Sequence, residues 1–251
     1  CSCPGAPPTR SATARAVPTL RPARLVTPAA LPTPAALPDR ELARRSLHGC
    51  AEMFAALGRA AAGREAEVRR PDAIGARLDD ARFNPFFSSA VVPVGTPPPR
   101  DDPSLPFYVW TVDDAVPGRA LDPESVTPLM GLVLDEGDDL LVAAWGASAP
   151  PIDRPPLATL GDLNERAYGE SGFAGLVTAL ADDRFGVHGV RAADGGAFVC
   201  VAMTLALGDD LGIYYVATEP AYRRRRLASQ LVGALLLDAR ARGFRTSTLQ
   251  A

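Results

Sequence analysis

Four consecutive arginines, Arg223 to Arg226, stand between a run of strand-forming residues and a helical pattern. A helix begins with backbone N–H groups that lack intrahelical acceptors and with the positive end of the helix dipole. Such a position suits a phosphate, and guanidinium groups add charge-assisted donors. The small residues Ala228 and Ser229 would let a ligand approach the backbone. The segment therefore indicates a phosphate or diphosphate site.

The same arginines also allow a plainer interpretation, a solvated surface loop. Like charges at a helix start oppose the dipole, so four cations there are costly unless an anion meets them. We therefore expect a negative ligand, with the solvated loop as the alternative. A Rossmann-type dinucleotide site would need G-x-G-x-x-G after the strand, and this turn has arginines instead.

Other residues with catalytic chemistry are scattered along the chain. Cys200 lies among apolar residues of an expected strand and is interpreted as core, and His188 as a satisfied or solvent-facing side chain. Tyr168 is a core residue or lines the acceptor side. Candidate general bases, none distinguished from an ordinary surface carboxylate, are Asp162, Glu165, Glu170 and Glu219. The catalytic residue stays unassigned.

The second half of the chain shows the clearest elements. Apolar periodicity predicts two helices, then strands, a helix that ends before Gly243 and a last strand. The Asp194-Gly-Gly196 turn predicts a hairpin. The order is β-β-β-α-β, which requires one parallel pair with a right-handed crossover. The expected ranges are Leu157–Tyr168, Phe173–Ala181, Val187–Ala192, Ala197–Thr204, Leu211–Thr218, Arg226–Arg242 and a strand from Phe244.

The first half of the chain is predicted to form a tail followed by a smaller α+β domain. Residues 1–38 are rich in Pro, Ala and Arg and are predicted to be disordered. Asp39 is the expected N-cap of a helix whose pattern runs to Leu57. Strands are expected at Ala66–Arg70, Ala73–Leu78, Phe86–Val92 and Phe107–Val112. A Pro-rich stretch near residue 150 divides an N-terminal domain, 39–150, from a C-terminal domain, 151–251.

Composition narrows the function classes. The 251 residues contain 26 basic residues, all arginine, and carry a net charge of −3, so no global field recruits nucleic acid or anionic membrane. Four cysteines fit neither a disulfide framework nor paired zinc-binding spacing, which favours a reducing cytoplasm and no metal. No apolar run is long enough for a membrane span. A globular enzyme or binding module remains.

The arginine segment resembles the acetyl-CoA signature of the GCN5-related N-acetyltransferases (GNAT), (Gln/Arg)-x-x-Gly-x-(Gly/Ala). Arg223 falls on the first position and Ala228 on the last, while Arg226 stands where the family has glycine. Val216–Tyr222 matches the strand that leads into the motif. Leu163–Gly169 is similar to the family's first helix, and Ala239–Ala251 to its helix-to-strand passage. The resemblance covers about residues 157–251.

The resemblance implies a mixed α/β (α+β) GNAT-like sheet and N-acetyltransfer from acetyl-CoA to an unknown small-molecule or peptide amine. The amine attacks directly in a ternary complex, and backbone N–H groups near Val216 and Thr218 polarise the thioester. The N-terminal domain would be a scaffold or hold the acceptor. The cofactor-binding residues implied are Val216, Ala217, Thr218, Arg223, Arg224, Arg225, Arg226, Leu227, Ala228 and Ser229.

Both ends of the chain look cut, and the family's elements after the last strand are absent from the sequence. The alternative is therefore a non-catalytic or degenerate CoA-binding relative. If the sheet ends near Ala251, its last strand would be an unpaired edge beside an uncovered apolar helix face. Unpaired edges promote association, so we expect self-association of this chain.

Overall fold

The computed structural model describes residues 37, 39–80, 82, 85–96, 104–106, 108–111, 129–134, 150–169 and 171–250. The predicted tail, residues 1–38, lies outside this set apart from residue 37. The described helices and strands are α1 (Asp39–Ala62), β1 (Glu67–Arg70), β2 (Ala73–Ala76), β3 (Ser89–Val91), β4 (Tyr108–Trp110), β5 (Leu129–Val133), α3 (Leu157–Tyr168), α4 (Phe173–Thr178), β6 (Phe185–Arg191), β7 (Phe198–Leu207), β8 (Asp210–Thr218), α5 (Leu227–Ala241) and β9 (Thr246–Gln250).

The described strands form two mixed sheets, of order β1-β2-β3-β4 and β5-β9-β8-β7-β6. In the second sheet β6, β7 and β8 are antiparallel neighbours, and β8 pairs parallel with β9 across the crossover helix α5. The predicted β-β-β-α-β order, the hairpin and the parallel pair are thus confirmed. The mixed α+β class is confirmed as well.

The C-terminal strand is not the unpaired edge that we expected. All five residues of β5 pair antiparallel with β9, from Leu129 opposite Gln250 to Val133 opposite Thr246. β5 was missed because four apolar residues around Gly131 give a weak local signal, and their partner strand is more than a hundred residues away. The domain boundary near residue 150 stays a prediction. β5 precedes that boundary in the sequence, and it forms one edge of the second sheet.

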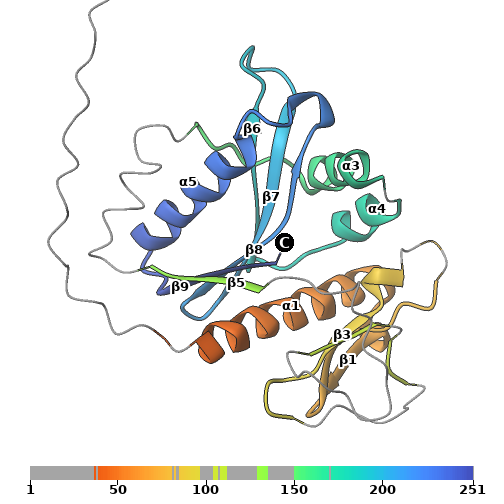
Figure 1. The fold of residues 1–251 in the computed structure, drawn as a ribbon. Helices are drawn as coiled ribbons and strands as arrows, with labels where there is room; N and C mark the ends of the chain where they lie inside the picture. The colour runs from red at the N-terminus through yellow and green to blue at the C-terminus, as the bar shows by residue number, and fades with distance from the viewer. Residues whose placement is uncertain are drawn as a thin grey trace, which may run out of the picture. The chain divides into compact units, whose positions relative to one another are not determined.

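The side chains of β7 point alternately to the two faces of the second sheet, and different helices cover each face. Val201, Met203 and Leu205 are buried in one cluster with α1, α3 and α4, whereas Cys200 and Ala202 are buried with α5. Successive strand residues point to opposite faces, so one strand supplies both cores. Figure 1 shows α5 on one side of the sheet and α3 and α4 on the other. The reading of Cys200 as core is confirmed.

Helix α1 joins the two sheets. Its Gly49 lies so close to β8 that a Cβ there would collide with the hydroxyl of Tyr214. Arg45 donates to Asp209 (2.7 Å) and to the Thr246 hydroxyl (2.9 Å), beside β9. Glu52 accepts from Arg69 of β1 (2.7 Å) and from Arg184 near β6 (3.4 Å). Close packing and ion pairs therefore hold α1 against both sheets.

Candidate functional site

The loop before α5 presents backbone donors. Gln230 N–H is the first of the helix to find an intrahelical acceptor, the carbonyl of Arg226, and no side chain caps the helix among the described residues. Arg224 and Arg226 both adopt left-handed backbone, each with φ 62°. Arg226 is the residue that replaces the motif glycine, and it keeps the backbone conformation that glycine favours. Arg226 therefore occupies a backbone conformation that a glycine would adopt readily.

The four arginines have different surroundings. Arg223 donates to the carbonyl of Ala167 at the end of α3, and Arg225 lies over the ring of Tyr222, 4.8 Å from its centroid. The side chains of Arg224 and Arg226 are exposed, and neither guanidinium group forms a hydrogen bond or ion pair with the residues that the structure describes. Two of the guanidinium groups thus fix the loop, and two remain available for an anion.

We expect Arg226→Gly to stabilise the free protein. An L-residue in left-handed backbone costs about 1–2 kcal/mol, and the substitution also removes one of four clustered cations. Glycine loses more backbone entropy on folding, so a net gain of about 1 kcal/mol is expected. Thermal unfolding without ligand measures it. The control is Arg225→Gly in the same loop, where φ is not positive and glycine should lower the melting temperature.

Strand β8 is bulged where it faces the site. The register with β7 shifts between Val201 and Met203, so two residues, Tyr215 and Val216, lie opposite Ala202 alone. Tyr215 adopts φ 51°, an uncommon conformation for a bulky residue. Bulges of this kind redirect backbone groups beside functional sites.

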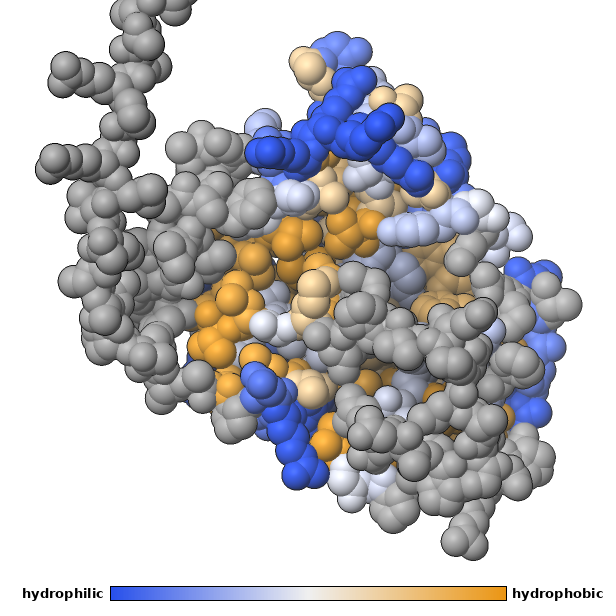
Figure 2. Space-filling model, in the orientation of Figure 1, coloured by the Kyte–Doolittle hydropathy of each residue, from blue (hydrophilic) through white to orange (hydrophobic). Residues whose placement is uncertain are grey.

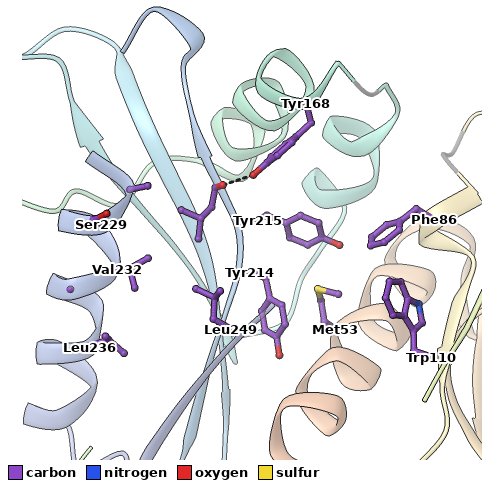
Figure 3. Close-up of a pocket in the computed structure, with 13 residues that line it drawn as sticks. Met53, Phe86, Trp110, Tyr168, Tyr214, Tyr215, Ser229, Val232, Leu236 and Leu249 are labelled. Atoms are coloured by element: carbon purple, nitrogen blue, oxygen red, sulfur yellow. Dashed lines mark hydrogen bonds between the residues drawn. The ribbon is translucent and has the colours of Figure 1, made fainter. Parts of the chain in front are cut away.

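Helix α3 binds both carbonyls of the bulge. Asn164 is buried and its Nδ2 donates to the carbonyl of Tyr215 (3.2 Å) as well as to that of Leu160 (2.9 Å). The Tyr168 hydroxyl donates to the carbonyl of Val216 (2.7 Å), as Figure 3 shows. The N–H of Val216 is trans to the Tyr215 carbonyl, so it points away from α3. Two side chains one helical turn apart therefore orient the backbone of the bulge.

A cavity of about 640 Å³ opens where β8 and β9 separate. The two strands pair only as far as Ile213 opposite Leu249. Figure 3 shows α5 on one side of the opening and Met53, Phe86 and Trp110 on the other. In the described part of the chain no charged side chain lines it, and the lining residues are Met53, Phe86, Trp110, Tyr168, Tyr214, Tyr215, Val216, Ala228, Ser229, Val232, Gly233, Leu236 and Leu249.

Eight of the ten predicted cofactor-binding residues fall into two groups at the cavity. Val216, Ala228 and Ser229 line the cavity, and Arg223 to Leu227 form the loop and helix start beside it. Ala217 is buried in β8, and the Thr218 hydroxyl donates to Cys200 Sγ (3.4 Å). Their role in binding stays a prediction.

Of the candidate bases, Asp162, Glu165 and Glu219 do not line the cavity. Glu219 is paired with Arg166 (3.0 Å), and the Glu165 carboxylate accepts from the backbone N–H of Ala174 in α4 (2.9 Å). Asp162 is exposed on α3 and Glu170 lies outside the described residues. Tyr168 is 61% exposed and lines the cavity, so the alternative of a core residue was wrong. The catalytic residue remains unassigned.

His188 is a buried, neutral side chain of β6. Its Nε2 lies 3.0 Å from the Thr204 hydroxyl, and it does not line the cavity. Burial lowers the pKa of His188 to about 4, and the nearby positive charge of Arg154 acts in the same direction. The interpretation of a satisfied histidine is confirmed, and the residue bears on stability instead.

We expect acid to destabilise the protein through His188. The unfolded side chain takes up a proton at its ordinary pKa of 6.5 and the folded one only at about 4. The contribution of the neutral His188 to the free energy of unfolding is therefore complete above pH 6.5, and it is lost as the pH falls from 6.5 to about 4. The loss is on the order of 3 kcal/mol. Urea unfolding at pH 7 and pH 4.5 should show this loss in the wild type and a smaller one in His188→Gln, which serves as the control.

Some residues of the site had no individual signal in the sequence. Met53 comes from α1, Phe86 from the 3-10 turn Pro85–Phe87 and Trp110 from β4 of the first sheet, and about a hundred residues or more separate them from β8. Asn164 belongs to the segment compared with the family's first helix, but its contact with Tyr215 could not be read from spacing. Only the folded chain brings these side chains to one cavity.

Comparisons with known proteins point to one family. Residues 134–249 match the family model described as an acetyltransferase (GNAT) domain. No curated protein sequence matches the chain. Within the regions that the structure describes, no group of three potential metal ligands is found, and no helix is long and apolar enough to cross a membrane.

Solved structures of acetyltransferases match the chain at low identity and with TM-scores below 0.5. A GCN5-related N-acetyltransferase from Kribbella flavida is 16% identical, with 84% of each chain covered and a TM-score of 0.47. The ribosomal-protein-S18-alanine N-acetyltransferase from Escherichia coli is 18% identical over 38% of this chain, with a TM-score of 0.34. An aminoglycoside 6'-N-acetyltransferase complexed with coenzyme A is 15% identical over 37%, with a TM-score of 0.32. The chain covers 61% and 57% of the last two, less than two thirds of their lengths.

Proposed function

Residues 134–249 form an acetyltransferase domain of the GNAT family, and from this premise we propose that the chain transfers an acetyl group from acetyl-CoA to an amine. One observation carries the proposal. The unpaired start of α5 stands at the mouth of an apolar cavity that opens beside the bulge of β8. Donors that suit an anion, an apolar cavity and oriented backbone groups are thus adjacent.

The residues present fit coenzyme A. The first N–H groups of α5 and the exposed guanidinium groups of Arg224 and Arg226 suit a diphosphate. Ala228, Ser229 and Gly233 leave room along α5 for a thin, mostly apolar arm. Acetyl-CoA, when bound, supplies an activated thioester. Its affinity for this chain is a prediction that rests on the donor set of the loop.

The bulge of β8 is proposed to stabilise the charge that develops during transfer. Asn164 holds the Tyr215 carbonyl, which turns the N–H of Val216 away from α3. A preorganised backbone donor at a cavity wall stabilises an oxyanion because it needs no reorientation during the reaction. Asn164 and Tyr168 are then positioning residues, and the Val216 N–H is the group that touches the reacting atoms.

Direct attack by the amine is the mechanism that the cavity supports best. Cys50 and Cys200 are buried, and no cysteine is among the described residues that line the cavity. A covalent acetyl-cysteine intermediate therefore has no candidate among the lining residues that the structure describes. The amine and the thioester would instead be held together in one cavity, where proximity replaces a bimolecular encounter.

Calorimetric titration with acetyl-CoA, followed by thiol-release assays over a panel of amines, tests the proposal. Tight binding with thiol release that depends on an amine supports acetyl transfer. Binding without release over the whole panel would leave the alternative, a non-catalytic CoA-binding relative. Absence of binding would contradict both, and the arginine loop would then be a solvated surface.

A further inference from the structure

The far end of the cavity is an aromatic wall supplied by α1, by the 3-10 turn Pro85–Phe87 and by β4 of the first sheet. Met53, Phe86 and Trp110 lie there, across the opening between β8 and β9 from the α5 residues that we assign to the cofactor (Figure 3). Phe86 contacts Trp110 edge to face, with centroids 5.8 Å apart and an interplanar angle of 82°. The ring of Phe54 packs on Phe86 in the same manner, 5.7 Å away.

This wall is fixed before any ligand arrives. The indole N–H of Trp110 donates to the Ser89 hydroxyl (3.1 Å), and that hydroxyl donates to the carbonyl of Phe86. One serine therefore holds both aromatic residues. Because the indole N–H is already used, Trp110 has only its rings to offer a ligand. A rigid apolar wall binds an apolar group with little loss of side-chain entropy.

The lack of charged side chains among the described lining residues further restricts the chemical class of the acceptor. Among the described lining residues there is no carboxylate to pair with an ammonium group and no cation to pair with an acid. A polycation or a polyhydroxylated amine would lose its hydration without compensating partners. The same volume of about 640 Å³ must also hold the acetyl end of the donor, so the acceptor has to be compact.

We propose that the acceptor is a compact aromatic amine whose ring lies against Met53, Phe86 and Trp110 and whose nitrogen faces the gap between β8 and β9. The inference rests on the proposed function. The nitrogen lone pair forms the C–N bond as the C–S bond breaks. The nitrogen gives up one proton to water and the thiolate takes one from water, so that amine and acetyl thioester become amide and free thiol. A weakly basic aromatic amine is already uncharged at neutral pH and needs no base.

Competition between amines tests the acceptor class. Thiol release by the full chain is measured with 4-methylaniline, 2-phenylethylamine, spermidine, glucosamine and a lysine-containing peptide. We expect kcat/KM for 4-methylaniline, which is uncharged at neutral pH, to exceed that of each other amine by about tenfold or more, the discrimination that an apolar pocket achieves. Any other ranking overturns the inference while the acetyl transfer itself stands.

Substitutions in the aromatic wall test whether its residues bind the amine. Trp110→Ala should lower kcat/KM for the aromatic amine about tenfold or more through KM, and Trp110→Phe should restore most of it. Phe198→Ala removes an aromatic ring of β7 that does not line the cavity and serves as the control. Unchanged affinity for acetyl-CoA shows that each variant is folded. Equal KM values for Trp110→Ala and Phe198→Ala would contradict the assignment.

A binding measurement separates failure of the inference from failure of the proposed function. The substitution Trp145→Phe leaves Trp110 as the one tryptophan of the chain. Titration with 4-methylaniline should change its fluorescence saturably without acetyl-CoA, after correction for absorption by the amine, and spermidine should not. If no amine is acetylated but the fluorescence changes saturably, the result supports the aromatic binding site and contradicts acetyl transfer. If the fluorescence does not change, the result contradicts the aromatic binding site.

Discussion

Ala228→Glu is expected to weaken acetyl-CoA binding about 100-fold or more, the largest effect on affinity that we predict. Ala228 is the second residue of α5 and lines the cavity beside the arginine loop. A carboxylate there would compete for the first N–H groups of the helix and would repel a diphosphate. The same carboxylate interacts favourably with the helix dipole, by about 0.3–1 kcal/mol. The free protein should therefore be as stable as the wild type, or more so.

Calorimetry and thermal unfolding together check this prediction. Ala241→Glu, at the exposed last residue of the same helix, introduces the same side chain far from the loop and should leave affinity within about twofold. Ala228→Gln separates bulk from charge and should give an intermediate loss. Wild-type affinity in Ala228→Glu would exclude the start of α5 as the anion site.

Replacing the two side chains that hold the bulge of β8 is expected to lower kcat. Asn164→Leu removes the donor to the Tyr215 carbonyl, and Tyr168→Phe removes the donor to the Val216 carbonyl. Loss of one oxyanion donor costs about 100- to 1,000-fold in kcat. Asn164 acts on such a donor indirectly, so we expect about 100-fold for Asn164→Leu and about tenfold for Tyr168→Phe, with KM for acetyl-CoA little changed.

The split between kcat and KM distinguishes positioning from general destabilisation. Tyr168 is largely exposed, so Tyr168→Phe should unfold at the wild-type temperature, whereas Asn164→Leu should lose about 1–2 kcal/mol. Because both residues hold one bulge, the double variant should lose less than the product of the single effects. Tyr108→Phe in β4 is the control, since Tyr108 does not line the cavity. Equal losses in kcat for Tyr108→Phe and Tyr168→Phe would contradict the role of Tyr168.

The sequence predicted the elements that local signals define. α3 has the predicted bounds because prolines precede Leu157 and a left-handed Gly169 follows Tyr168. The turn at Asp194–Gly196 correctly indicated the β6–β7 hairpin, since Gly195 adopts positive φ. Periodicity fixed the order of the C-terminal elements, and the order required the parallel pair. These features depend on neighbours only a few residues apart.

The sequence did not predict β5 or the bulge of β8. β5 is a strand because β9 supplies its partner, and the antiparallel pairing closes a loop of more than a hundred residues. The left-handed backbone of Tyr215 runs against the preference of a bulky residue, and contacts from α3 compensate for it. Such features arise from distant partners, which override local preference.

The sequence by itself determined the arginine loop at the start of α5, the GNAT-like order of elements and the small residues that leave the helix start open. These follow from side-chain type and short spacing, on which helix ends and turns depend. Only the tertiary structure decided that Asn164 and Tyr168 orient the bulge and that Met53, Phe86 and Trp110 face α5 across one cavity. Packing between elements far apart in the chain sets those contacts, and no local pattern encodes them.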